Sequence, residues 1–136
     1  MPIPSINELT RAEENVMLVL WQRGPSFVKD VQAALPAEPA LAYTTVSTII
    51  RLLEQKGFVR HEAFGRTHRY SPLIEQDAYR QFLLHKLVSN YFGGSFGGLL
   101  GFYIRAAGLD AAQLGQLVGQ AYQQLGPAGS SGAPGQ

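Results

Sequence analysis

The sequence predicts a mainly α-helical fold in which three helices, a β-hairpin and three further helices follow one another. Apolar residues recur at intervals of three and four through residues 10–57 and 75–121, which is typical of helices with one buried face. Between these stretches, residues 58–72 hold two short runs of aromatic, β-branched and basic residues around a glycine, and this pattern favours a hairpin. The 136 residues, 46% of them hydrophobic, suffice for one ordinary domain or a small domain with an appendage.

The first two helices are marked by their capping residues. Thr10 and Glu13 have the spacing of a capping box, which predicts a first helix over residues 10–23. A Gly-Pro pair ends this helix, and we expect Ser26 to cap a second, short helix that ends near Leu35. The residues that follow contain two prolines, which exclude a helix and predict a connection.

The third helix, expected over residues 43–57, has two different faces. Its buried ridge consists of aliphatic residues at helical spacing: Val46, Ile49, Ile50 and Leu53. The opposite face consists of short polar side chains and one arginine: Thr44, Thr48, Arg51 and Gln55, with Ser47 at its flank. Three helices followed by a hairpin at residues 58–72 predict a winged helix-turn-helix.

The polar face and the hairpin together have the chemistry of a DNA-binding surface. Short hydroxyl side chains let a helix approach base edges, and an arginine suits a guanine or a phosphate. A merely solvated face would be better served by Lys and Glu, which are stronger helix formers. The chain has a net charge of only +1, yet residues 51–72 gather basic side chains and histidines that suit phosphates. These are Arg51, Lys56, Arg60, His61, Arg66, His68 and Arg69.

The second half of the chain predicts a helical dimerisation domain. Helices are expected over residues 75–91, from Ser95 to about Ala107, and after Asp110, where Ser95 and Asp110 act as caps. Three apolar helices are too few for a core of their own, so we expect them to pack against a second copy of the chain. The expected dimerisation residues are Leu84, Leu87, Val88, Tyr91, Phe92, Leu99, Leu100, Phe102, Leu114, Leu117 and Val118.

These elements divide the chain into three parts. We expect a winged-helix domain over residues 1–73 and the helical dimerisation domain over residues 74–125. Residues 126–136 are Gly, Pro and Ser with little to bury, and are expected to be a disordered tail.

Catalysis and metal binding are disfavoured. The absence of cysteine removes thiolate nucleophiles and cysteine-ligated metals. The three histidines lack carboxylates at ligand spacing, and no GxxxxGK[ST] loop is present. The serine in "FGGSFGG" is better explained by a helix break than by the strand elbow that would present it as a nucleophile. We therefore expect no cofactor, no metal and no enzymatic activity.

The N-terminus and the apolar stretches predict a cytoplasmic protein. The first ten residues lack the basic and apolar regions of a signal peptide. The longest apolar stretch, residues 91–104, is shorter than the roughly 20 residues that a membrane span needs, so no membrane insertion is expected.

Four segments in order resemble the penicillinase and methicillin-resistance repressors. "LTRAEENVMLVLWQRGP" resembles the first helix of that family, and "TTVSTIIRLLEQKGFV" its recognition helix and the entry to the wing. "GRTHRYSP" is similar to the second strand of the wing, and "YFGGS" to the junction before the closing helices. The resemblance spans about Leu9 to Leu125.

The resemblance implies a homodimeric winged-helix repressor that binds palindromic operator DNA. It implies DNA contacts at Thr44, Thr45, Ser47 and Thr48 in the helix and at Arg66 and His68 in the wing. Of these, Thr45 lies off the polar face and is expected to contact a phosphate or to pack.

The resemblance also implies a mode of release. In the best-known members a membrane sensor with a metalloprotease domain leads to cleavage of the repressor before a phenylalanine, which here is the Gly101–Phe102 bond. The asparagine that precedes the cut in those members is glycine in this chain. The copper-responsive branch uses cysteines, which this chain lacks.

Two alternatives stay open. A small ligand bound among Phe92, Phe96, Phe102 and Tyr103 would make the chain a ligand-responsive regulator, although aromatic residues of this kind more often form a dimer core. Alternatively, the basic hairpin would bind an acidic protein surface, and the chain would be a protein-interaction module.

Overall fold

A computed structural model describes residues 6–36 and 39–125. The chain forms two compact units, which divide between Lys86 and Leu87. This division lies inside a helix, α4 (Gln76–Tyr91). The predicted tail over residues 126–136 lies outside the described residues.

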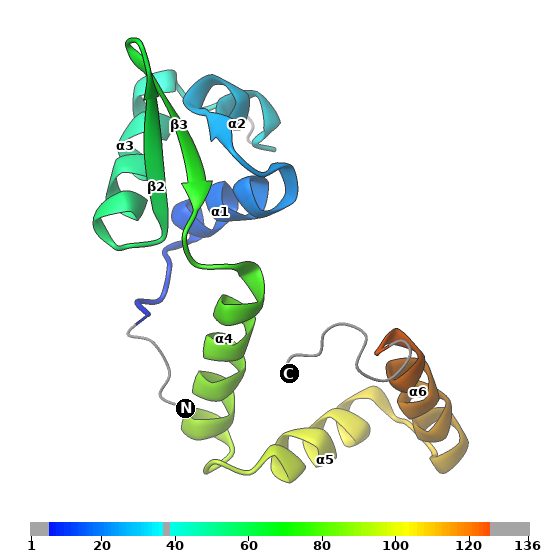
Figure 1. The fold of residues 1–136 in the computed structure, drawn as a ribbon. Helices are drawn as coiled ribbons and strands as arrows, with labels where there is room; N and C mark the ends of the chain where they lie inside the picture. The colour runs from blue at the N-terminus through cyan, green and yellow to red at the C-terminus, as the bar shows by residue number, and fades with distance from the viewer. Residues whose placement is uncertain (1–5, 37–38, 126–136) are drawn as a thin grey trace. The chain divides into compact units, whose positions relative to one another are not determined.

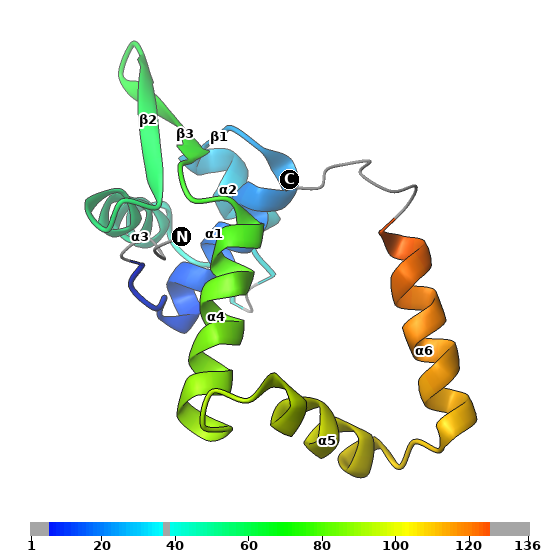
Figure 2. The same ribbon diagram turned by 60° about the horizontal axis from the view of Figure 1, so that its bottom comes forward.

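The first unit has the element order of a winged helix. Its elements before α4 are α1 (Arg11–Arg23), β1 (Ser26–Phe27), α2 (Val28–Ala34), α3 (Tyr43–Gln55), β2 (Val59–Phe64) and β3 (Thr67–Pro72). The strands form an antiparallel sheet in the order β1-β3-β2. In Figures 1 and 2 the β2–β3 turn projects beyond the helices of this unit. The predicted fold class, mainly α with a winged helix-turn-helix, is confirmed.

The core of the first unit is formed by aliphatic and aromatic side chains from all of its helices. Phe58 and Tyr79 pack edge to face, and the indole N–H of Trp21 donates to the carbonyl of Ile74 at 2.9 Å. The backbone N–H of Leu9 donates to the Tyr79 hydroxyl at 2.9 Å, and burial raises the pKa of that hydroxyl. The start of α4 is therefore part of this core.

The predicted helix boundaries are confirmed for α1. The Thr10 hydroxyl accepts from the backbone N–H of Glu13, and the Glu13 carboxylate accepts from the backbone N–H of Thr10. Both bonds satisfy helix N–H groups that would otherwise lack partners.

The prediction that Ser26 caps the second helix was wrong. Ser26 is buried in β1, where it pairs with Tyr70, and its hydroxyl donates to the carbonyl of Gly24. α2 begins at Val28, and the Asp30 carboxylate accepts from the backbone N–H of Phe27 at 3.0 Å. Asp30 thus performs the capping that the sequence indicated for Ser26.

The predicted hairpin is confirmed as β2 and β3, which are joined by Gly65 and Arg66. The register pairs Phe64 with Thr67, so the turn consists of Gly65 and Arg66 alone. Gly65 has a φ of 64°, which only glycine adopts at little cost.

The second unit contains the end of α4 with α5 (Phe96–Ala107) and α6 (Ala111–Gln124). Both predicted caps are confirmed: Ser95 accepts from the N–H of Gly98, and Asp110 accepts from the N–H of Gln113. In residues 87–125 no side chain is fully buried. None of the described helices is both long and apolar enough to cross a membrane.

The division after Lys86 differs from the boundary predicted after residue 73. The first turns of α4 belong to the first unit because Tyr79 is buried there, with Phe82 and Leu83 packed against the same core. The functional division at residue 73 stays a prediction.

Candidate nucleic-acid interface

The two faces of α3 differ in burial as the sequence predicts. Val46, Ile50 and Leu53 are completely buried, whereas Ile49 is only half-buried at the edge of the core. On the opposite face the polar side chains are exposed: Thr44, Thr48, Arg51 and Gln55. This face is therefore open to a large ligand.

Two predicted contact residues lie at the flank of this face. Ser47 is half-buried, which leaves its hydroxyl only partly accessible. Thr45 is exposed, so its side chain is accessible, and the expected phosphate or packing contact stays a prediction.

Hydrogen bonds within α3 order two of the polar side chains. The Thr48 hydroxyl donates to the carbonyl of Thr44 at 2.9 Å, one helical turn earlier. The same hydroxyl accepts from the Arg51 guanidinium at 3.4 Å. The Thr48 hydroxyl therefore donates its proton within the helix and holds the guanidinium of Arg51.

Strand alternation places the hairpin residues on two faces. Val59 and Tyr70 point into the core, and His61 and His68 continue that face beyond it, next to α3. Arg66 lies in the turn and is exposed.

Ion pairs reduce the positive patch predicted from the sequence. Lys56 binds Glu13 at 2.7 Å and Arg69 binds Glu62 at 3.1 Å, so these two cations already have carboxylate partners. Within residues 6–36 and 39–125, the patch cations without a carboxylate partner are Arg51, Arg60 and Arg66.

Glu13 has a structural role that the sequence indicated only in part. The capping pattern predicted its bond to Thr10, but the contact with Lys56 joins residues 43 positions apart. Burial acts to raise the pKa of Glu13, and the hydrogen bonds from Lys56 and Thr10 outweigh it, so the pKa lies below its ordinary value.

Arg69 is held on the outer face of the hairpin. Its guanidinium lies 4.9 Å from the centre of the Phe64 ring, which in turn contacts Phe27 edge to face. The stacked geometry and the bond to Glu62 indicate that Arg69 stabilises the hairpin.

A hollow of about 230 Å³ brings together residues that the sequence did not connect. It lies between α2, the first turn of α3 and the start of β3, and His68 is the predicted site residue in its wall. Lys29 and Tyr43 also line it, and the sequence analysis did not select them. Their proximity depends on the packing of α2 against α3, for which local sequence gives no signal.

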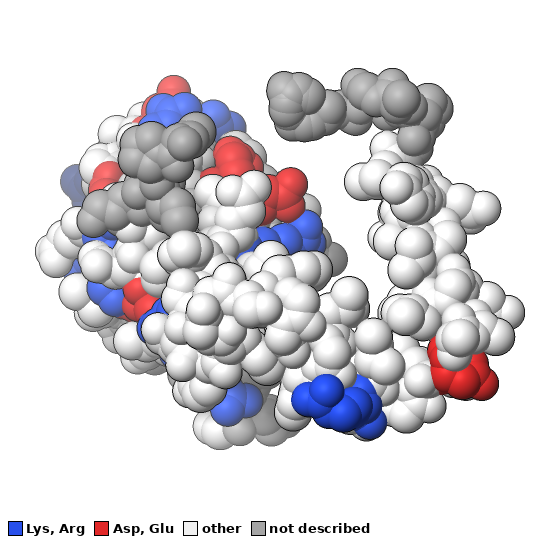
Figure 3. All heavy atoms as spheres, turned by 90° about the horizontal axis from the view of Figure 1, so that it is seen from below, with Lys and Arg blue, Asp and Glu red and all other residues white. Residues whose placement is uncertain are grey.

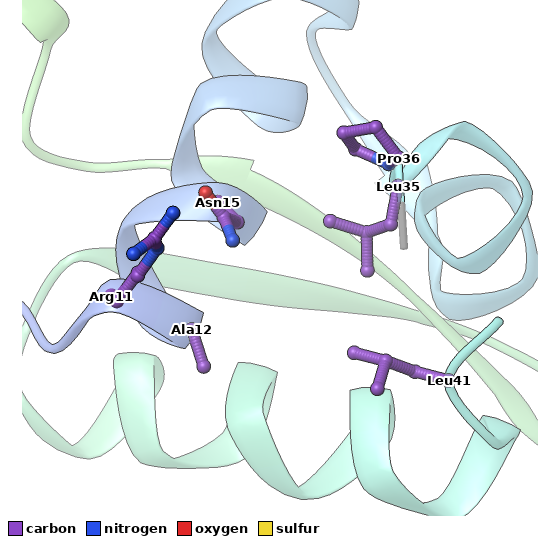
Figure 4. A pocket seen from close by; sticks show the side chains of 6 residues that line it. All are labelled: Arg11, Ala12, Asn15, Leu35, Pro36 and Leu41. Carbon is purple, nitrogen blue, oxygen red and sulfur yellow. The ribbon is translucent and has the colours of Figure 1, made fainter. Parts of the chain in front are cut away.

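A second hollow of about 370 Å³ lies between α1 and the ends of the α2–α3 connection. Figure 4 shows Arg11 and Asn15 rising from α1 on one side and Leu35, Pro36 and Leu41 on the other. None of the predicted site residues lines it.

The apolar stripes of the second unit are largely exposed. The predicted dimerisation residues range from half-buried to exposed, with Tyr91 77% and Phe102 52% exposed. Arg105 and Asp110 are the only charged residues between positions 87 and 125, and this part of the surface is almost entirely white in Figure 3. A surface of this composition is typical of an interaction site.

A hollow of about 470 Å³ lies within the second unit. It is lined by Leu87, Tyr91, Phe92, Leu99 and Phe102. The alternative ligand pocket included Phe96 and Tyr103, and these two residues do not line the hollow. The part of the chain that the structure describes contains no cluster of metal-ligating side chains.

Residues 9–121 match the family model described as Penicillinase repressor. The chain belongs to the penicillinase repressor family. This confirms the resemblance seen in the sequence. Because the family consists of transcriptional repressors, it also confirms the expectation that the chain is not an enzyme.

Named relatives in the penicillinase repressor family match over different lengths. The "Transcriptional regulator BlaI" of Mycobacterium tuberculosis is 40% identical over 73 residues, which are 53% of this chain and 53% of the relative. The match thus spans about half the length of that relative. The "Penicillinase repressor" of Bacillus licheniformis is 22% identical over 112 residues, which are 82% of this chain and 88% of the relative.

A solved structure of a protein that is also named BlaI is similar to this chain. The solution structure of the DNA binding domain of the repressor BlaI aligns with a TM-score of 0.47 and 28% identity. The alignment covers 57% of this chain and 92% of that domain.

In this member of the penicillinase repressor family, the predicted cleavage bond Gly101–Phe102 lies inside α5. Gly101 is half-buried and Phe102 is exposed. Because the bond lies within a regular helix, a protease would need this part of α5 to unfold locally.

Proposed function

We propose that this chain is a cytoplasmic transcriptional repressor that binds operator DNA through α3 and the β2–β3 hairpin. The main support is the accessible polar face of α3, where Thr44, Thr48 and Arg51 lie opposite the completely buried ridge. Side chains of this size allow close approach to base edges in the major groove. Arg66 in the projecting turn adds a cation for a backbone phosphate.

The proposal includes a homodimer formed through the second unit. The exposed apolar side chains of α4, α5 and α6 support it, because a chain that exposed them to water would be poorly soluble. A two-fold dimer presents two copies of α3, so the operator is expected to be an inverted repeat. Its half-sites should lie about 34 Å apart, or at a multiple of that distance.

Selection of bound sites from random duplexes tests the proposal directly. The purified full-length chain should enrich one sequence that reads the same on both strands. Enrichment of a single half-site would contradict the dimeric arrangement. Absence of any enrichment, together with salt-independent binding, would contradict sequence-specific repression.

The same selection with Thr48→Ala tests the role of α3. Loss of the Thr48 methyl group and of its bond to Arg51 should change the preferred base at one position of each half-site. Selection with Gln81→Ala, an exposed residue of α4, is the matched control and should leave the preferred sequence unchanged. An unchanged preference in Thr48→Ala would remove α3 from base recognition.

Release by proteolysis is part of the proposal. The correspondence of Phe102 to the phenylalanine that follows the cut in the resembled repressors supports a cut in α5, which would divide the dimerisation surface. The protease of a membrane sensor would act on this bond as a partner protein.

A ligand-responsive regulator is the second candidate. It is supported by the hollow of about 470 Å³ in the second unit, whose lining is almost wholly apolar. An apolar ligand there would raise the melting temperature of the full chain and weaken its binding to DNA, whereas a dimer contact would leave the hollow inaccessible to such a ligand.

A further inference from the structure

The hollow between α2, α3 and β3 has a mostly apolar lining, to which Phe27 and Val28 contribute, with polar groups from three different elements at its wall. Its polar lining consists of Lys29 and Asp30 from α2, Tyr43 from α3, and Thr67 and His68 from β3. The volume of about 230 Å³ admits one phosphate group with its neighbouring atoms.

Two of these polar groups are already occupied by internal bonds. The Asp30 carboxylate accepts from the backbone N–H of Phe27, and the Thr67 hydroxyl donates to the carbonyl of Phe64 at 3.0 Å. Within the described ranges, Lys29 has no carboxylate partner and the Tyr43 hydroxyl has no hydrogen bond. An ammonium and a phenolic O–H are therefore available to an anion, beside the imidazole of His68.

The imidazole of His68 stacks on a second imidazole that has its own carboxylate. The rings of His68 and His61 are 4.1 Å apart and 10° from parallel. The Nδ1 atom of His61 lies 2.7 Å from a carboxylate oxygen of Glu54 in α3. The Glu54 carboxylate can balance a positive charge on the His61 ring. A positive charge on the His68 ring would need a second anion, which can reach it from the hollow.

We propose that Lys29, Tyr43 and His68 bind a backbone phosphate of duplex DNA, and that His68 takes up a proton when the phosphate binds. This inference rests on the proposed DNA-binding function and deepens it. It adds α2 to the interface, and it makes DNA affinity depend on pH.

The charged and titratable groups that face His68 come from every neighbouring element. Lys29, Asp30 and Tyr43 line the same hollow, and the rings of His61 and Tyr70 lie against the His68 ring. One step further away, Glu54 contacts His61, and the charges of Glu54 and Arg51 act on Tyr70. Burial raises the pKa of Tyr70, so this phenol stays neutral between mildly acidic and neutral pH.

The direction of the pH effect follows from linkage. The DNA-bound state holds one more proton than the unbound state, so binding is favoured at low pH and weakens as the pH rises through the histidine range. For one linked imidazole, the affinity should fall severalfold between about pH 6 and about pH 8, and by no more than about tenfold per pH unit.

Fluorescence anisotropy with a labelled random-sequence duplex measures this effect on the full-length chain. The wild type should show the full pH dependence, and His68→Gln should lose most of it. His85→Gln is the matched control, because His85 is exposed on α4 and is the only histidine outside the stack. Equal pH dependence in wild type and His68→Gln would overturn the proton uptake.

The salt dependence of binding tests Lys29 separately. Lys29→Gln should reduce the slope of log affinity against log salt by about one unit. Arg23→Gln, which removes a charge at the end of α1 away from the hollow, should leave the slope nearly unchanged. An unchanged slope in Lys29→Gln would overturn the phosphate site while leaving DNA binding intact. Absence of duplex binding by the wild type would overturn the proposed function and this site together.

The NMR signals of His68 distinguish DNA from free phosphate as the source of the anion. Near pH 7 they should move toward their protonated position when the unlabelled duplex is added in stoichiometric amounts. A response to inorganic phosphate alone would overturn the assignment to DNA.

Discussion

Glu13 is almost fully buried and joins two ends of helices. Its carboxylate accepts from the backbone N–H of Thr10 at the start of α1 and from the Lys56 ammonium at the end of α3. Glu13 is 4% exposed, so neither partner is easily replaced by water.

Glu13→Gln should destabilise the first unit by about 1–2 kcal/mol at neutral pH, because the amide keeps the helix cap but loses the charge opposite Lys56. The folded-state pKa of Glu13 is lowered, so its stabilisation is present above the ordinary carboxyl pKa of 4.5 and is lost as the pH falls through the lower folded value. Urea unfolding at neutral and at acidic pH measures both effects. Glu14→Gln is the control on the neighbouring position, and an equal loss in both variants would contradict the special role of Glu13.

Arg66 is exposed in the turn of the hairpin and has no carboxylate partner among the described residues. Arg66→Ala should weaken binding to all duplexes and reduce the salt slope by about one unit, because one phosphate contact is lost. Filter binding at several salt concentrations provides the measurement. Arg80→Ala, whose guanidinium binds Asp77 on α4, is the control. A slope that stays the same in Arg66→Ala would show that the turn does not touch the backbone.

The sequence predicted the accessible face of α3 but not which cations are available. Helical periodicity alone separates Thr44, Thr48 and Arg51 from the buried ridge. In contrast, the pairing of Lys56 depends on a contact between α1 and α3, and that of Arg69 on the register of two strands. Neither follows from a local pattern, so the predicted positive patch was too large.

At the scale of the elements, β1 is the strand that the sequence did not predict. It has only two residues, Ser26 and Phe27, too few for any alternation to be visible. These residues are extended because they pair with Tyr70 and Arg69 of β3. The pairing partners lie 44 and 42 positions away in the chain, so a local pattern cannot predict this strand. In contrast, the caps Thr10, Ser95 and Asp110 lie next to the helices that they begin and can be predicted from adjacent residues.

The two-residue turn of the hairpin depends on Gly65. Gly65→Ala should destabilise the first unit by about 1 kcal/mol, because alanine resists a positive φ. Thermal unfolding followed by circular dichroism tests this. Gly119→Ala in α6 is the matched control and should be neutral or stabilising by about 0.5–1 kcal/mol, since helix favours alanine. If both substitutions destabilise the protein, the positive φ of Gly65 would not explain the loss of stability, and contacts between protomers would be the alternative cause.

At the scale of the whole molecule, burial is concentrated in the first unit. Every fully buried hydrophobic side chain lies between Leu9 and Tyr79, within the described residues. The second unit has helices with good caps but no core of its own. The first unit should therefore be stable alone, and the second should need a partner.

A fragment of residues 1–86 should fold as a monomer with cooperative thermal unfolding, while the full chain should sediment as a dimer. The fragment should bind an operator much more weakly than the full chain, because its two copies are no longer joined and bind the two half-sites independently. Analytical ultracentrifugation and gel retardation measure these properties. A dimeric fragment, or a monomeric full chain, would contradict dimerisation through the second unit.

The contact between Trp21 and the segment that leads into α4 has a practical consequence. The chain contains one tryptophan, and its indole lies 5.9 Å from the Tyr79 ring while it donates to Ile74. Its emission spectrum is thus an intrinsic optical signal from the base of α4, obtained without any dye. A spectral shift upon mixing with a duplex or a protease would reveal, in real time, whether that junction loosens.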